Sequence, residues 1–97
     1  MPKFVVLANF TDQGAKNAKE TTKRAAAFRE MAKKAGVSLR DIYWTMGAHD
    51  LLILLEAPDD ETVASVLLSL GALGNIRTQT LRAFSAEEME KIIGKAT

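Results

Sequence analysis

The feature that most constrains the fold is an uninterrupted run of five aliphatic residues, Leu51 to Leu55. The run follows a turn signal at residues 46–50 and ends shortly before Pro58, a setting that favours a β-strand. Successive side chains of a strand point to opposite faces of its sheet, so this strand needs cover on both faces. One layer of helices covers only one face. The other face must be covered in another way.

The remaining segments alternate between strand-type and helix-type patterns. β-Branched and aromatic residues predict a strand at 3–10, and two less apolar strands are expected at 37–45 and 75–84. Apolar residues at helical spacing predict helices at 21–35 and 59–71 and a short one after Ser85. A turn is expected at 11–14, with a turn of helix at 15–19 before the first long helix.

Helix ends are marked by residues with known capping chemistry. Asp59 is the expected N-cap of the second helix, because its carboxylate can accept bonds from free backbone amides. Ser85 and Glu88 have the spacing of a capping box at the start of the third. Gly36 is the expected stop of the first, after Lys33 and Lys34, which we expect to face solvent.

The order of these elements predicts the fold. Strand, helix, strand, strand, helix, strand is the split β-α-β pattern of a ferredoxin-like α+β sandwich, here one domain over 1–97 with an extra C-terminal helix. The most apolar strands, 3–10 and 51–55, take the central positions in that topology. Both helices then pack on one face and leave the other apolar and open, which normally marks an interface. We therefore expect a homodimer built as a dimeric α/β barrel, or a larger homo-oligomer.

Charge and composition exclude several partners and sites. Thirteen Lys and Arg against twelve Asp and Glu leave a net charge of +1, which argues against nucleic-acid binding through a broad basic face. Apolar runs are too short for a membrane span, and we expect no membrane association. The absence of cysteine excludes disulfides and thiolate metal ligands and suits a cytoplasmic protein. We expect no metal and no cofactor, since the chain's one His and its carboxylates have no recognised ligand spacing.

His49 is the strongest single candidate for chemistry. It is the only histidine, and imidazole is the side chain that titrates near neutral pH. One interpretation makes it a general acid or base, or a lone metal or haem ligand. The other makes it a turn residue between Gly47 and Asp50, which needs no chemistry. The second interpretation is favoured, because a catalytic histidine needs a positioned partner.

A small-ligand site can be assembled from neighbouring strand ends. Asn9 ends the first strand, Trp44 and Tyr43 lie on opposite faces of the second, and Arg77 and Gln79 share one face of the fourth. The predicted ligand-binding residues are Asn9, Trp44, His49, Arg77 and Gln79, with Asn9, Trp44 and His49 as the catalytic candidates if there is catalysis. The alternative is that the aromatics are core or dimer contacts and the arginines lie on the surface.

Several segments together match the pattern of a known family: residues 5–14 (VVLANFTDQG), 23–25, 28–29, 32–37, 43–45 and 70–84 (LGALGNIRTQTLRAF). In this combination the chain resembles the GYD-domain proteins over nearly its whole length. The resemblance implies a ferredoxin-like, oligomeric protein and implies no particular activity. One departure is the Gly-Tyr-Asp that names the family, where His49 stands at the place of the tyrosine. A role for His49 as an essential base or haem ligand is therefore disfavoured.

Two functions of different classes follow. The first is a homo-oligomeric small-ligand-binding or assembly module, whose partners are further copies of itself and a small molecule. The alternative is a cofactor-independent monooxygenase or isomerase of the dimeric α/β-barrel type, acting on a small aromatic or haem-like compound, which rests on analogy at the level of the fold. The alternative requires Asn9, Trp44 and His49 to converge on one cavity.

Overall fold

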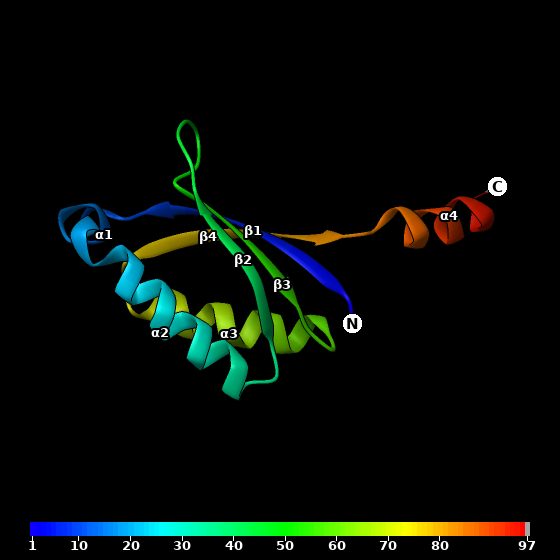
Figure 1. Ribbon diagram of the computed structural model, residues 1–97, viewed down its shortest axis with the longest axis horizontal. Helices are drawn as coiled ribbons and strands as arrows, with labels where there is room; N and C mark the ends of the chain where they lie inside the picture. The colour runs from blue at the N-terminus through cyan, green and yellow to red at the C-terminus, as the bar shows by residue number, and fades with distance from the viewer. Residues whose placement is uncertain (97) are drawn as a thin grey trace.

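Four strands form one antiparallel sheet in the order β2-β3-β1-β4 (Figure 1). The computed structural model describes residues 1–96. The strands are β1 Lys3–Phe10, β2 Ser38–Trp44, β3 Leu51–Glu56 and β4 Ile76–Ala83. The helices are α1 Asp12–Lys16, the 3-10 turn η1 Ala18–Glu20, α2 Thr21–Lys34, α3 Asp60–Ala72 and α4 Ala86–Lys95. The ferredoxin-like order is confirmed, with the two most apolar strands, β1 and β3, at the centre.

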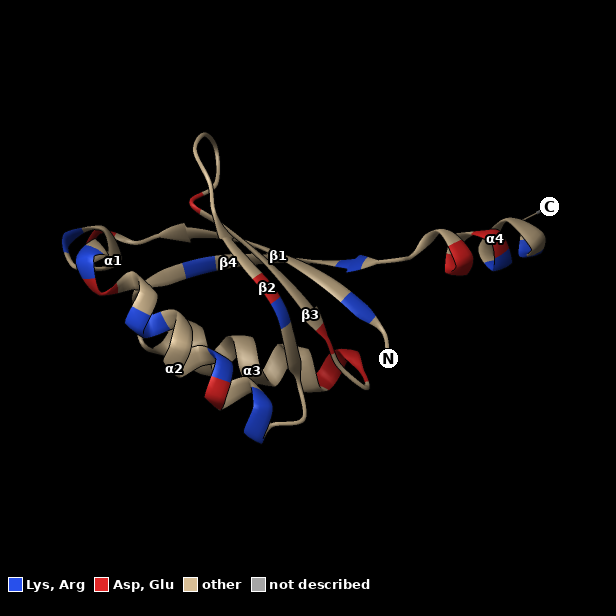
Figure 2. Ribbon diagram, in the orientation of Figure 1, with Lys and Arg blue, Asp and Glu red and all other residues tan. Residues whose placement is uncertain are grey.

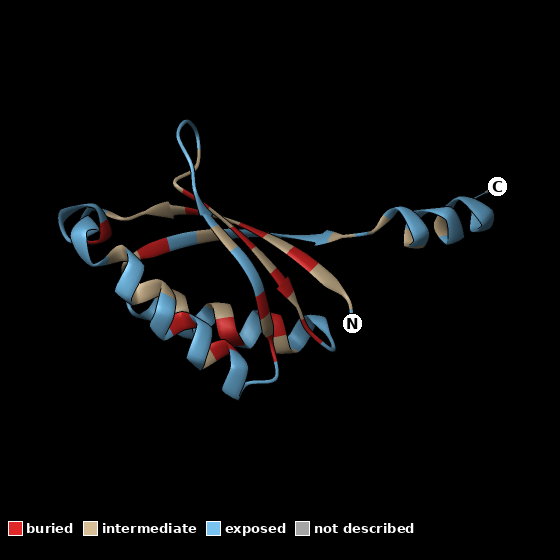
Figure 3. Cartoon of the chain, viewed as in Figure 1, coloured by how far each residue is buried: buried red, intermediate tan, exposed pale blue. Residues whose placement is uncertain are grey.

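The core lies between this sheet and helices α2 and α3, which cover the same face (Figures 1 and 3). Alternate residues of both central strands point into it, so burial along β1 and β3 has a period of two. From the sheet, the buried side chains on this face are Phe4, Val6, Ala8, Leu39, Leu51, Ile53, Leu55 and Ile76, and from the helices Phe28, Ala32, Val63 and Val66. Burial of these apolar groups is the main stabilising contribution.

The predicted helix caps are confirmed. The Asp59 carboxylate accepts bonds from both the backbone amide (2.8 Å) and the hydroxyl (2.7 Å) of Thr62 at the start of α3. These two bonds hold the pKa of Asp59 below its usual range, the hydroxyl contributing most. Gly36, just after α2, has φ +83°, a left-handed conformation that glycine adopts at little cost. Lys33 and Lys34 are exposed, as expected.

The segment after β1 differs from the turn expected at 11–14. The Thr11 hydroxyl accepts a bond from the Gly14 amide at 3.1 Å and caps the short helix α1 there. The same hydroxyl donates to the Gly74 carbonyl, and the Thr11 amide donates to the Asn75 carbonyl at 3.0 Å. Threonine thus starts a helix and ties it to the entrance of β4. Local turn chemistry alone does not distinguish a cap from a turn at such a residue.

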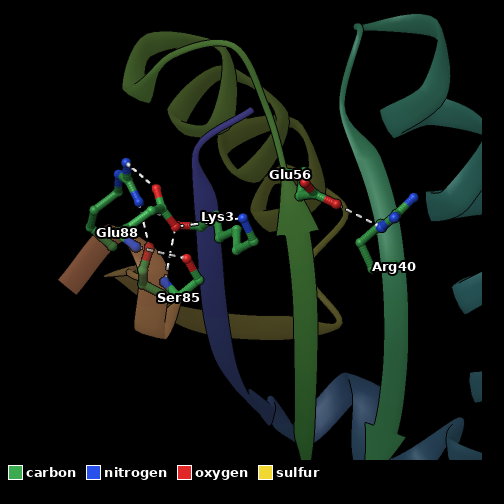
Figure 4. Close-up of polar contacts among 7 residues, drawn as sticks. Lys3, Arg40, Glu56, Ser85 and Glu88 are labelled. Carbon is green, nitrogen blue, oxygen red and sulfur yellow. Dashed lines mark hydrogen bonds and ion pairs between the residues drawn. The ribbon is translucent and has the colours of Figure 1, made fainter. Parts of the chain in front are cut away.

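The C-terminal helix α4 projects from the end of the sheet, beyond the layer formed by α2 and α3 (Figure 1). Its first turn is the predicted capping box: Ser85 Oγ accepts from the Glu88 amide at 3.1 Å, and Glu88 Oε1 accepts from the Ser85 amide at 2.9 Å. Glu88 also contacts Lys3 Nζ at 3.5 Å (Figure 4). Within the described chain, α4 has no buried residue, and Met89 and Ile93 are 45% and 56% exposed.

Candidate functional site

The face of the sheet opposite the helices carries aliphatic side chains that α2 and α3 do not cover. Val5 lies opposite Leu54 and Leu7 opposite Leu52 in the β1–β3 pair, and all four are partly exposed. On the other side of β1, Leu81 lies opposite Val5 and is 42% exposed. We call Val5, Leu7, Leu52, Leu54 and Leu81 the open-face cluster. It is the apolar second face that the sequence predicted.

Charged groups border this cluster at the end of the sheet near the N-terminus. Arg40 Nε lies 2.6 Å from Glu56 Oε2, across the β2–β3 pair, and Lys3 contacts Glu88 of α4 (Figure 4). Most other charged residues belong to the helices (Figure 2), but Asp41 on β2 is paired with Leu54 and so lies on this face as well. The open face therefore has an apolar centre with ion pairs at one end, an arrangement found in protein–protein interfaces.

At the opposite end of the open face, Asn9 and His49 lie together. Asn9 Oδ1 is 2.9 Å from His49 Nδ1, and Asn9 Nδ2 donates to the Ala48 carbonyl at 2.8 Å. Asp50 adds two bonds: its carboxylate accepts from the Phe10 amide at 2.8 Å, and its own amide donates to the Ala8 carbonyl at 2.9 Å. These contacts hold the β2–β3 loop against the end of β1. His49 thus has a positioned partner, and that partner is a neutral amide.

Arg77 and Gln79 also lie on the open face, since each is paired with a β1 residue of that face. Arg77 is opposite Asn9, and Gln79 is opposite Leu7. The Arg77 guanidinium turns back toward the end of α3, where it donates to the carbonyls of Gly71 (3.4 Å) and Ile76 (3.2 Å). Asn9, His49 and Gln79 therefore share one side of the sheet, whereas the Arg77 guanidinium is directed toward the helix layer.

Trp44 lies on the other side. It is paired with the buried Leu51, so its side chain points toward the helix layer. Its indole Nε1 donates to Thr21 Oγ1 at the start of α2, at 3.0 Å, and the side chain remains 43% exposed. The sheet therefore separates Trp44 from Asn9 and His49. Of the three catalytic candidates, the structure brings two together and leaves the third on the opposite face.

A cavity of about 270 Å³ lies between the sheet and the two long helices, close to Trp44. Its walls are mostly apolar, and its polar lining residues are Thr21, Arg24 and Asn75. The sequence patterns did not predict this cavity. The sequence feature that could have indicated it is the row of small residues Ala25 to Ala27 in α2, of which Ala25 and Ala27 line the cavity.

Comparison with known proteins places this arrangement in a family. The sequence profile of the GYD domain matches residues 4–93. The chain belongs to the GYD-domain family. It is also similar to a protein of Thermus thermophilus named glutamine synthetase and cystathionine beta-lyase binding protein. The two are 32% identical over 90 residues, which cover 92% of this chain and 95% of that relative.

Solved structures show the same fold. The crystal structure of TTHA0845 from Thermus thermophilus superposes on this GYD domain with a TM-score of 0.58 and 25% identity, over 89% of this chain and 96% of that one. MtbAldR superposes with a TM-score of 0.63 and 16% identity. The match covers 87% of this chain and 52% of MtbAldR, and at that identity it shows the fold alone.

Residues 1–96 contain neither a membrane-spanning helix nor a cluster of metal ligands. No helix there is long and apolar enough to cross a membrane. No group of three or more His, Asp or Glu side chains in the same part of the chain could hold a metal ion.

Proposed function

We propose that this GYD-domain protein is a homo-oligomeric assembly module that binds enzymes. In its basic unit two copies pack sheet to sheet around a two-fold axis, as a dimeric α/β barrel. The observation that carries the proposal is the open-face cluster: five aliphatic side chains on the two central strands and β4 that the protein's own helices leave uncovered.

A second copy is the partner that fits this face best. A two-fold interface is self-complementary, and an aliphatic centre can pack against its own copy without any specific charge pattern. The bordering Arg40–Glu56 pair is already neutralised within one chain, so it places no unpaired charge at the edge of the interface. Val5 lies at the centre of the cluster, between Leu54 on β3 and Leu81 on β4, and Leu54 lies at its edge, beside Asp41 on β2.

The enzyme-binding part of the proposal comes from the relative. Its name says that it binds glutamine synthetase and cystathionine β-lyase, and this chain matches almost its full length at 32% identity. We propose that this chain likewise binds enzymes, with those two as the first partners to test. A dimer presents each binding surface twice, which raises the avidity for oligomeric enzymes.

The ligand-binding role predicted for individual residues stays a proposal, with its members divided by the sheet. Asn9 and His49 lie at one end of the open face and Gln79 lies beside Leu7, where a second copy would enclose them, whereas the Arg77 guanidinium is directed toward α3. Trp44 belongs to the helix side. We do not propose the monooxygenase or isomerase alternative, because Trp44 faces away from Asn9 and His49 and the three groups do not surround one substrate.

The sheet-to-sheet interface is tested by making the same substitution, Leu to Lys, once on the sheet and once on the helix layer. Leu54→Lys places a charge in the open-face cluster, whereas Leu68→Lys places the same charge on α3, where the wild-type side chain is 76% exposed. We expect Leu54→Lys to yield monomers in size-exclusion chromatography with light scattering, and Leu68→Lys to keep the wild-type mass. If both variants keep the wild-type oligomer, the sheet-to-sheet interface is wrong.

Enzyme binding is measured separately by biolayer interferometry, with immobilised wild-type protein and purified glutamine synthetase or cystathionine β-lyase from the same organism. The proposal predicts saturable binding of at least one enzyme and a faster dissociation rate for Leu54→Lys than for Leu68→Lys. Absence of binding of both enzymes to a properly folded wild-type oligomer would contradict the choice of these partners.

A further inference from the structure

We propose that the cavity between the sheet and helices α2 and α3 binds a small monocarboxylate with an apolar body. The apolar part fills the cavity, and the carboxylate lies at its rim beside Thr21 and Arg24. This site is on the opposite side of the sheet from the open-face cluster. The inference goes beyond the proposed assembly function and does not rest on it.

The size and lining of the cavity define the apolar part of the ligand. A dry cavity of about 150 Å³ in another protein holds benzene, so about 270 Å³ accommodates a body up to about twice as large. The inner wall is formed by Phe28 and Met31 of α2, Ile42 and Ile53 of the sheet, and Leu70 of α3. These side chains offer no hydrogen bonds beyond the weak acceptor sulfur of Met31, so the buried part of a ligand has to be hydrocarbon.

Thr21 supplies the first polar group at the rim. Its hydroxyl oxygen accepts the indole N–H of Trp44 at 3.0 Å, which leaves the hydroxyl proton to be donated elsewhere. Among residues 1–96 that proton has no acceptor. Thr21 and Arg24 are three positions apart on α2, so their side chains lie on the same side of the helix, one turn apart.

Arg24 supplies the charge. Its guanidinium donates through Nη1 to the Asn17 carbonyl (2.6 Å) and through Nη2 to the Gly14 carbonyl (3.3 Å). Those bonds use two of the five N–H donors of arginine, and they fix the orientation of the group. No carboxylate in the described part of the chain lies within ion-pair distance of it. A single unneutralised guanidinium next to an apolar cavity favours a monoanion, and its planar fork matches a carboxylate.

The first experiment uses the wild-type protein with two isosteric probes, octanoate and octanamide. Both have the same hydrocarbon body, but only octanoate carries a charge. Binding is followed by NMR of the methyl group of Met31, which lines the cavity, and by the fluorescence of Trp44, which is bonded to Thr21. We expect both signals to shift with octanoate at saturation and octanamide to bind about tenfold or more weakly. Equal affinities, or an unperturbed Met31 methyl group, would overturn the proposal.

The second experiment assigns the charge to Arg24. Arg24→Gln should weaken octanoate binding about tenfold and leave octanamide binding unchanged, whereas Arg24→Lys should retain part of the preference for octanoate. Lys34→Gln is the matched control: the same change of charge on an exposed residue of α2 that does not line the cavity. Undiminished octanoate binding by Arg24→Gln would overturn the assignment. Should Arg24→Gln fail to fold, the comparison of the two probes on wild-type protein still decides the proposal.

Discussion

Asn9 Oδ1 lies 2.9 Å from His49 Nδ1, and this contact connects the end of β1 to the β2–β3 loop. The second bond of the same amide, from Nδ2 to the Ala48 carbonyl at 2.8 Å, determines which atom faces the imidazole. Because Nδ2 must donate to that carbonyl, the oxygen Oδ1 is left for His49, and Nδ1 must carry a proton. His49 is thus held in one tautomer as part of a loop clamp.

His49→Ala should loosen this loop without unfolding the domain. The variant loses one hydrogen bond, which corresponds to about 1 kcal/mol. The bonds of Asp50 to Phe10 and Ala8 remain in place and keep β3 in register. We expect faster amide hydrogen exchange at residues 45–49, while exchange along β3 is unaffected. Met46→Ala in the same loop is the control, since Met46 is fully exposed and its loss should change neither. Unchanged loop exchange in His49→Ala would show that the clamp contributes nothing.

Gly14→Ala should destabilise the protein because there is no room for a methyl group. A Cβ at Gly14 would lie 1.9 Å from the Asn75 carbonyl oxygen, a backbone atom that cannot move without displacing the start of β4. Overpacking of this kind costs about 1–3 kcal/mol. The measurement is the free energy of unfolding from urea denaturation.

Gly71→Ala is the matched control for that experiment. It lies in α3, and a Cβ there would meet nothing within 4 Å among residues 1–96. We expect this variant to be stabilised by about 0.5–1 kcal/mol, because alanine has the higher helix propensity. Equal effects of the two substitutions would mean that α1 does not pack against Asn75 in this way.

Ser85→Ala should unfold the first turn of α4 locally and leave the rest of the domain intact. Loss of an N-cap serine costs about 1 kcal/mol of helix stability. The described residues of α4 include no buried side chain, so this local loss is not transmitted to the core. Amide exchange in α4 should accelerate while the thermal midpoint of the whole domain stays constant. A lower midpoint would indicate that α4 packs against a second copy or another part of the protein.

Acidification should have the same local effect, through Glu88. The amide and hydroxyl of Ser85, and then the charge of Lys3, hold the pKa of Glu88 below its ordinary value of 4.5. A group whose folded pKa is depressed stabilises the folded state above its unfolded pKa. That contribution disappears as the pH falls through the lower, folded value. We therefore expect α4 to be unaffected from neutral pH down to about 4.5 and to fray below it.

Amide exchange of α4 measured against pH tests this expectation. Glu88→Gln is the control, because glutamine also serves in a capping box but does not titrate in this range. Its α4 should show no acid-dependent fraying of this origin. Fraying of wild-type α4 that begins well above pH 4.5 would require a different titrating group.

Much of the fold could be predicted because each decisive signal is local. The aliphatic run Leu51 to Leu55 identified a strand that is apolar on both faces, and the caps Asp59 and Ser85 located two helix starts. The position of α4 could not be predicted, since its amphipathic pattern specifies an apolar face but not what that face contacts. The helix α1 was missed because Thr11 can either cap a helix or initiate a turn, and its bond to Gly74 is a tertiary contact.

The site was harder to predict because it depends on register between strands that are not neighbours in the sheet. Asn9 and Trp44 lie on β1 and β2, which are separated by β3. A register shift between Leu39 and Asp41 places one extra residue in β2, and this changes which side of the sheet Trp44 faces. Sequence patterns do not reveal such a bulge. Asn9 and His49, by contrast, meet because the β2–β3 loop leads directly into β3, which is paired with β1.

The central claim is that a second copy covers the open-face cluster, and sedimentation equilibrium of the wild-type protein at micromolar concentration tests it most directly. One chain has a mass of 10.6 kDa. We predict a mass of twice that value, or an even multiple of it, that persists on dilution through the micromolar range. A single species of 10.6 kDa at the highest concentration would contradict the claim and leave the aliphatic face of the sheet without a partner.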